Sequence, residues 1–317
     1  MDFPPRPPRQ PTERGTPRER SPGPRGLRRP DRAGPARPAP APGAPKRSRR
    51  RGPRRETLAR IGVAVPWIVV AILVIAVGDL PFALAMIGFA VIGLGELFRM
   101  TRRYRPMIPV AFVAVAAMVL AAFYGDQFQI VLVGVATFPL MFAFALVRGP
   151  REGVTRSMAI TVLGIAWIGL PFTHAVLLRE LPVHGGALVI DVLVGTFLTD
   201  TSAYAGGRLF GRHRLAPNLS PNKTVEGLVF GFVGGTMGFW FAGLYQDWLT
   251  GIDALIMGMC IAALAPVGDL FESMVKRDLE IKDTGRAFGP HGGLLDRLDA
   301  VLFTIVAGYY LAVAFVY

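Results

Sequence analysis

The sequence predicts an all-α, polytopic integral membrane protein with about nine transmembrane helices. Of its 317 residues, 52% are hydrophobic and only 18% are charged, a balance that is unusual for a water-soluble globule. The apolar residues also gather in stretches of about 17–20 residues, the length that a helix needs to cross a bilayer. These stretches lie near residues 61–78, 80–98, 108–124, 129–147, 158–177, 185–203, 226–245, 252–271 and 299–317.

Residues 1–60, which precede the first of these stretches, differ from the rest of the chain. They hold 18 of the 35 Lys and Arg residues, 5 of the 22 Asp and Glu residues and 15 of the 27 prolines, so the whole net charge of +13 lies here. Few large apolar side chains are present to offset the entropy of ordering. We expect a disordered Arg/Pro-rich cytoplasmic tail whose Arg47–Arg55 cluster attracts anionic headgroups, in preference to an RNA-binding or partner-binding tail.

The connectors between the predicted spans alternate in charge. If the tail is cytoplasmic, the cytoplasmic connectors hold 16 basic residues and the opposite connectors hold only Arg179. Basic residues are enriched in cytoplasmic connectors of membrane proteins. The sequence therefore predicts a cytoplasmic amino terminus and a carboxyl terminus on the other side of the membrane.

The predicted span at 226–245 carries several glycines on one face. Gly227, Gly231 and Gly235 recur four residues apart, with Gly234 and Gly238 beside them. Small residues at this spacing allow two helix backbones to approach closely. We expect this span to pack against another helix, either in the same chain or in another copy.

Acidic residues collect near the predicted cytoplasmic ends of three spans. Asp200 stands at the end of span 185–203, Asp269 and Glu272 stand at the end of span 252–271, and Asp296 and Asp299 begin the last span. Charges within or at the mouth of a span are costly and usually functional. The sequence therefore places its candidate chemistry on the cytoplasmic side.

One of these clusters continues as a stripe of acid and base. Asp269, Glu272, Ser273, Lys276 and Arg277 follow one another at the spacing of one helical face. A solvated amphipathic face is the alternative, but the residues around the acidic end are apolar. Carboxylates suit Mg²⁺ bound together with substrate phosphates, and Lys and Arg bind the phosphates themselves.

Two further segments offer phosphate-binding groups. SPNKTVEG supplies Ser220, Lys223 and Thr224 just before a predicted helix, whose amino terminus attracts anionic oxygen. HGGLLDR supplies glycines whose backbone N–H groups can approach a ligand closely. The chain has no G-x-x-x-x-G-K-[ST] loop, and its single cysteine, Cys260, excludes a Cys-based metal site. The sequence also suggests no Ser-His-Asp or Cys-His constellation, so we expect a substrate to provide the nucleophile.

The segment SMVKRDLEIKDTGRAFGPHGGLLDRLD, from Ser273 to Asp299, resembles the signature of the phosphatidate cytidylyltransferases (CDP-diacylglycerol synthases). DTSAYAGGRLFG and LSPNKTVEG resemble two further cytoplasmic elements of that family. Ser202, Asn222 and the Gly289-Pro290 pair depart from its usual residues. The resemblance is close over 185–317 and covers the first five spans only as apolar segments in the expected number.

This resemblance implies transfer of CMP from CTP to phosphatidic acid, which yields CDP-diacylglycerol and pyrophosphate in phospholipid biosynthesis. It implies Mg²⁺ as the cofactor and CTP, phosphatidic acid and membrane lipids as partners. No nucleic acid is expected, and a homodimer is left open. The protein would be a multi-pass protein of the cell inner (cytoplasmic) membrane, with a 1–60 tail, amino-terminal helices in 61–184 and a catalytic region in 185–317.

The resemblance also implies roles for individual residues. Asp269 and Asp296 are expected to bind Mg²⁺. The expected catalytic residues are Asp269, Asp296, Lys276, Arg277, Lys282 and Asp283, and the expected substrate-binding residues are Asp200, Ser220, Lys223, Thr224, Ser273, His291, Gly292, Gly293, Arg297 and Asp299. His291 is equally suited to fixing the Gly-Gly turn, and Arg297 to pairing with a neighbouring aspartate.

Two other functions use similar residues. A transporter or flippase for an anionic phospholipid would be expected to show inverted repeats with broken helices, whereas the acidic clusters lie only in the carboxyl-terminal half. A CTP-dependent lipid kinase would transfer the γ-phosphate instead. The products distinguish these functions, because the cytidylyltransferase releases pyrophosphate, the kinase releases CDP and the transporter releases neither.

Overall fold

The structure is a computed structural model that describes residues 69–149, 152–281, 284–285 and 293–317. The predicted tail at 1–60 lies outside these residues, as do the candidate site residues Lys282, Asp283, His291 and Gly292. Of the first predicted span, residues 69–78 are described, and 69–77 are helical.

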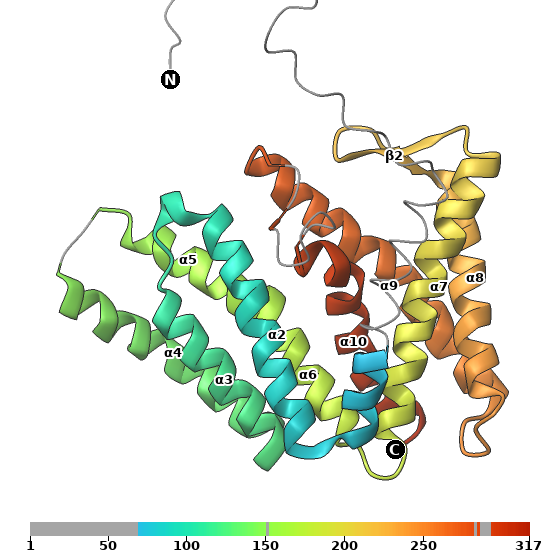
Figure 1. The fold of residues 1–317 in the computed structure, drawn as a ribbon, viewed down its shortest axis with the longest axis horizontal. Helices are drawn as coiled ribbons and strands as arrows, with labels where there is room; N and C mark the ends of the chain where they lie inside the picture. The colour runs from blue at the N-terminus through green and yellow to red at the C-terminus, as the bar shows by residue number, and fades with distance from the viewer. Residues whose placement is uncertain (1–68, 150–151, 282–283, 286–292) are drawn as a thin grey trace, which may run out of the picture. The chain divides into compact units, whose positions relative to one another are not determined.

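Helices make up most of the described chain (Figure 1). The α-helices are α2 (Asp79–Met100), α3 (Ile108–Tyr124), α4 (Gln127–Arg148), α5 (Val154–Gly164), α6 (Leu170–Arg179), α7 (Gly185–Phe210), α8 (Val225–Gly243), α9 (Gly251–Asp278) and α10 (Leu295–Phe315). A 3₁₀ turn, η1 (Arg102–Tyr104), follows α2, and a π-helical turn, η2 (Ile165–Gly169), joins α5 to α6 into one continuous helix.

The helices have the lengths and composition of membrane spans. Within the described residues, seven are long and apolar enough to cross a bilayer: α2, α4, the α5–α6 helix, α7, α8, α9 and α10. The apolar α3 is shorter, with 17 residues. The predicted class, a helical multi-pass membrane protein, is therefore confirmed.

Polar side chains mark the starts of several helices. Asp126 accepts a hydrogen bond from Phe128 N–H, and Gln129 accepts one from Asp126 N–H, which forms a capping box at α4. At α8 the Thr224 hydroxyl accepts from Gly227 N–H, and at α9 the Thr250 hydroxyl accepts from Asp253 N–H. These caps satisfy N–H groups that have no partner within their own helix.

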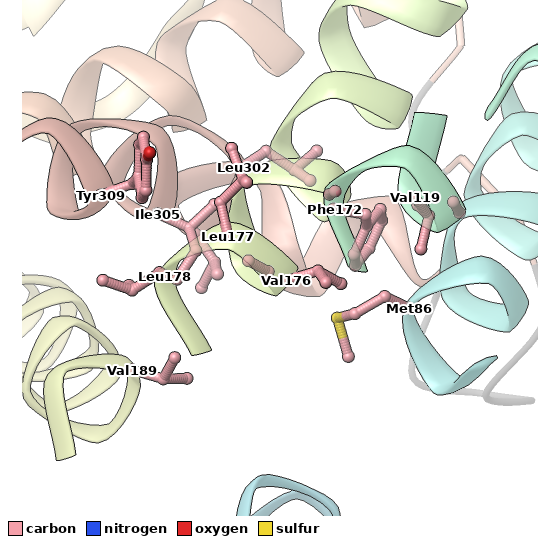
Figure 2. Close-up of a cluster of buried hydrophobic side chains, with 14 of the residues drawn as sticks. Met86, Val119, Phe172, Val176, Leu177, Leu178, Val189, Leu302, Ile305 and Tyr309 are labelled. Atoms are coloured by element: carbon pink, nitrogen blue, oxygen red, sulfur yellow. The ribbon is translucent and has the colours of Figure 1, made fainter. Parts of the chain in front are cut away.

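The apolar core lies where α2, α3, α6, α7 and α10 meet. Figure 2 shows side chains from all five helices converging there: Met86, Val119, Phe172, Val176, Leu177, Leu178, Val189, Leu302, Ile305 and Tyr309. A buried hydrogen bond of 2.8 Å joins Thr196 Oγ1 on α7 to Thr304 Oγ1 on α10. Such polar contacts between spans add to the packing that holds membrane helices together.

The glycine face of α8 packs against α7, so its neighbour belongs to the same chain. A methyl group at Gly235 would lie 1.9 Å from Thr199 Oγ1, and one at Gly231 would lie 2.8 Å from Ala203 Cβ. Figure 1 shows the two helices side by side, in yellow and orange. The prediction of close helix packing is confirmed, and only glycine leaves room for it.

Three segments that the sequence placed in connectors are regular structure. Helix α7 continues to Phe210 and α9 to Asp278, each seven residues beyond the predicted span. The SPNKT segment forms strand β2 (Ser220–Thr224), which pairs antiparallel with β1 (Arg214–Ala216). This hairpin is the one departure from an all-helical architecture among the described residues.

Candidate active site

The predicted site residues of α9 and α10 meet where α9 ends and α10 begins. Gly268 on α9 lies against α10, since a methyl group there would come within 2.4 Å of the backbone oxygen of Asp299. This close approach places Asp269, the next residue, beside the first turn of α10. Pro266, three residues before Asp269, lies inside α9. Because proline has no backbone N–H, the helix lacks one hydrogen bond just before the site.

Lys276 joins the two helices through ion pairs. Its Nζ lies 2.7 Å from Glu272 Oε2 on α9 and 3.0 Å from Asp296 Oδ1 on α10. Glu272 is almost fully buried, and both other side chains are partly buried. Breaking such a pair leaves a buried charge uncompensated and is costly.

Asp296 also organises the chain that leads into α10. Its carboxylate accepts hydrogen bonds from Gly293 N–H at 2.8 Å and from Thr284 N–H at 3.1 Å. Together with the Lys276 contact, these bonds occupy both of its oxygens. Asp296 therefore connects Thr284 and Gly293, two interior positions of the signature segment, to Lys276 on α9.

The β hairpin contributes the second lysine. Lys223 Nζ on β2 lies 2.5 Å from Asp269 Oδ2 on α9, with both side chains partly exposed. Asp200 on α7 interacts electrostatically with both members of this ion pair, Lys223 and Asp269. Three elements that are distant in sequence thus bring acid and base together.

A second concentration of negative charge lies deeper. Asp299 on α10 is close enough to Glu272, Asp269 and Asp200 for their charges to act on it. Its carboxylate accepts a hydrogen bond from Ala300 N–H at 2.9 Å. Within the described part of the chain, the buried Glu272 Oε1 has no hydrogen-bond partner. Grouped carboxylates repel one another, so the arrangement favours a cation between them.

These carboxylates suit a hard metal ion in their chemistry. Among the described residues, no group of three or more His, Cys, Asp or Glu side chains is arranged as a metal site. Mg²⁺, however, usually takes one or two carboxylates and completes its coordination with water and substrate phosphates. Asp269 and Asp299, with the unpartnered Glu272 Oε1 nearby, therefore fit Mg²⁺ as an oxygen donor set.

Other predicted residues lie at the edge of the cluster. Arg277 is exposed and donates from Nε to the backbone oxygen of Leu219 at 3.2 Å, which ties α9 to the hairpin. Thr224 Oγ1 accepts from Gly227 N–H as the α8 cap. Ser220 lies on β2, Ser273 is half-buried on α9, Gly293 is buried, and Arg297 is exposed on α10.

Sequence reasoning missed Glu96. It is completely buried at the last turn of α2. Its Oε2 accepts hydrogen bonds from Leu295 N–H at 3.0 Å and Thr284 Oγ1 at 3.4 Å. A methyl group at Gly285 or Gly293 would lie 2.5 Å from its oxygens. The available signal was the cost of an acidic residue inside an apolar stretch.

Fold and site together define a multi-pass helical membrane protein with lysines and carboxylates clustered at one end of its carboxyl-terminal helices. The chain belongs to the cytidylyltransferase family, whose model matches residues 58–315.

Curated relatives named phosphatidate cytidylyltransferase resemble the chain over different lengths. The Mycobacterium leprae protein is 36% identical over 165 residues, which are 52% of this chain and 53% of the relative. A Staphylococcus saprophyticus protein is 37% identical over 152 residues, or 46% of this chain and 56% of the relative. The Bacillus subtilis protein is 28% identical over 253 residues, which are 78% of this chain and 94% of the relative. The chain thus spans about half the length of the first two relatives.

Proposed function

We propose that this protein is a CTP:phosphatidate cytidylyltransferase, which transfers CMP from CTP to phosphatidic acid. Family membership and the name shared by these relatives support the proposal. The observation that carries it is the placement of Lys223 and Lys276 against carboxylates of α9 and α10. A site that joins two phosphate-bearing substrates needs cations for the phosphates and carboxylates for a metal ion.

The proposed reaction requires no nucleophile from the protein. A phosphate oxygen of phosphatidic acid attacks the α-phosphorus of CTP and forms a new P–O–P bond. The bond between the α-phosphorus and the oxygen that bridges to the β-phosphate breaks, and pyrophosphate leaves. The protein contributes by holding two anions together and by stabilising the charge that develops on the leaving group.

In our proposal the two lysines bind different phosphates. Lys276 is fixed between Glu272 and Asp296, so its ammonium group is already oriented and loses little freedom when a phosphate binds. Lys223 comes from β2, at the partly exposed edge of the cluster. We assign Lys223 to the triphosphate, which arrives from water, and Lys276 to a phosphate nearer the reacting centre.

Mg²⁺ is the proposed cofactor, with Asp269 and Asp296 as its predicted ligands. The contacts of Asp296 with Lys276, Thr284 and Gly293 favour Asp299 as the partner of Asp269. When bound, Mg²⁺ would neutralise phosphate charge during transfer. Asp200, near Asp269, is a further oxygen donor on the same side.

We further propose nine crossings with a cytoplasmic amino terminus. The helical residues 69–77 and the apolar α3, added to the seven long helices, support that number. The bacterial relatives support a location in the inner membrane, where CTP reaches the site from the cytoplasm and the lipid phosphate from headgroup depth. Membrane lipids as partners and a homodimer stay predictions, as do the 1–60 tail and the division at residues 184 and 185.

The decisive experiment incubates the purified full chain with phosphatidic acid, Mg²⁺ and CTP labelled either at the α-phosphate or at the γ-phosphate. We expect the α-label to enter the lipid fraction and the γ-label to leave as pyrophosphate. Lipid-soluble γ-label with CDP release would instead establish a lipid kinase. If neither label entered the lipid while labelled phosphatidic acid crossed a vesicle membrane, the protein would be a transporter.

A further inference from the structure

A cavity of about 250 Å³ lies apart from the α9–α10 cluster, among the ends of α2 and α4 and the starts of α3 and α5. Three arginines line it: Arg102 and Arg105 from the α2–α3 connector, and Arg148 from the last turn of α4. Met107 and Phe144 contribute apolar walls. The cavity therefore combines guanidinium groups with a surface suited to hydrocarbon.

The connector that carries two of these arginines is held in a defined shape. Arg105 has a φ of 52°, a left-handed conformation that is uncommon for a residue with a side chain. Ser157 Oγ on α5 lies 2.8 Å from the backbone oxygens of Tyr104 and Arg105, and Thr161 Oγ1 accepts from Met107 N–H at 2.9 Å. These buried or partly buried contacts fix the connector against α5.

The charge in the cavity is unbalanced. Within the residues that the structure describes, no carboxylate forms an ion pair with Arg102, Arg105 or Arg148, although Glu152 also lines the cavity. Arg148 instead lies over the Phe144 ring, with its guanidinium carbon 4.5 Å from the centroid. Three arginines that line one small volume favour an anion that accepts several hydrogen bonds.

The cavity stands at the same end of α2 as the reaction centre. Glu96, which contacts the start of α10, lies one turn before the end of α2, and Phe98 of that last turn lines the cavity. The adjacent face of α4 leaves Leu146 and Val147 exposed, as expected of side chains that face acyl chains. An anion bound there would sit at the depth of lipid headgroups.

We propose that this cavity binds the phosphate headgroup of an anionic phospholipid, with Arg102, Arg105 and Arg148 around the phosphate and the lipid chains along α4. Basic pockets between membrane helices commonly recognise such headgroups. The site does not depend on the reaction proposed above, because none of its residues belongs to the α9–α10 cluster.

The test measures binding of dioctanoyl phosphatidylglycerol, a phosphodiester lipid, to the purified full chain in detergent. We expect the double variant R105Q/R148Q to lose at least about tenfold in affinity. The matched control is R103Q, because Arg103 lies in the same connector but faces the Tyr104 ring and does not line the cavity. Glu152→Gln should bind more tightly than the native chain, since it removes the negative charge of the lining.

Two further ligands separate the possible sources of the anion. Dioctanoyl phosphatidylcholine, which has no net charge, should bind at least tenfold more weakly than phosphatidylglycerol, and glycerol 3-phosphate should bind weakly because it lacks acyl chains. Equal binding of phosphatidylcholine, or tight binding of glycerol 3-phosphate, would overturn the proposal. Unchanged binding in both R105Q/R148Q and Glu152→Gln would also overturn it. If the double variant does not fold, the affinity of Glu152→Gln alone decides: tighter binding than in the native chain supports the proposal, and unchanged binding overturns it.

Discussion

Glu96 on α2 accepts a hydrogen bond from Leu295 N–H on α10, with 3.0 Å between Oε2 and nitrogen, across 199 positions of sequence. Leu295 opens the helix that carries Asp296 and Asp299. An amino-terminal N–H group has no acceptor within its own helix. Glu96 supplies that acceptor from the amino-terminal half of the chain and so positions the first turn of α10.

We therefore predict that Glu96→Ala lowers turnover at least about tenfold and also lowers thermal stability in detergent, because it removes a buried acceptor and leaves a cavity. Glu96→Gln keeps one acceptor oxygen at the same place. It should restore a large part of both properties, as expected of a positioning residue. A Glu96→Ala variant with native turnover would contradict this role.

Lys276 and its neighbour Arg277 should differ in importance. Lys276 contacts two acidic residues inside the cluster, whereas the exposed Arg277 contacts a backbone oxygen of the hairpin. We predict at least about a hundredfold loss of kcat/KM in Lys276→Ala and less than about tenfold in Arg277→Ala, measured as pyrophosphate release. Equal losses would show that Arg277 contacts a substrate phosphate directly.

Lys223 should act mainly in binding CTP. Its partly exposed ammonium group lies 2.5 Å from Asp269 at the edge of the site. We predict that Lys223→Ala raises the KM for CTP at least about tenfold and changes the KM for phosphatidic acid much less. Asn222→Ala, at an exposed position of the same strand, is the control and should leave both constants unchanged. A selective rise in the KM for phosphatidic acid would reverse our assignment of the two lysines.

The α7–α8 contact predicts that alanine substitutions at two glycines of membrane spans differ in their effect on the stability of the protein. In Gly235→Ala the added methyl group would collide with Thr199 Oγ1, and overpacking of this kind costs about 1–3 kcal/mol. Gly134→Ala in α4 meets nothing within 4 Å and should be neutral or slightly stabilising, because alanine favours a helix. Thermal unfolding of both variants in detergent checks the prediction, and equal stabilities would contradict the packing.

Much of the helical scaffold could be predicted because a bilayer imposes a length and an apolar composition on every span. The predicted stretch at 108–124 coincides with α3, and the glycine spacing of α8 predicted its close packing. The ends of α7 and α9 were placed too early because their polar residues resemble a loop in composition. Those residues continue as helix beyond the apolar core.

The candidate site could be predicted only in part. The signature segment and the stripe on α9 pointed to Asp269, Lys276 and Asp296, and the structure brings the last two within 3.0 Å of each other. The contact of Lys223 with Asp269 depends on how the hairpin folds back, which no local pattern encodes. Glu96 was missed because its hydrogen-bond partners, Leu295 N–H and the Thr284 hydroxyl, lie far along the chain, near its carboxyl-terminal end.

The central claim is that the carboxylates at the α9–α10 end support nucleotidyl transfer. The most direct measurement is transfer of the α-label of CTP into lipid by Asp269→Asn, compared with Asp191→Asn. Asp191 is a buried carboxylate of α7 that accepts hydrogen bonds from Gln246 and lies outside the cluster. We predict at least about a hundredfold loss in Asp269→Asn without loss of folding, and near-native transfer in any Asp191→Asn protein that folds. Native transfer by Asp269→Asn would contradict the claim.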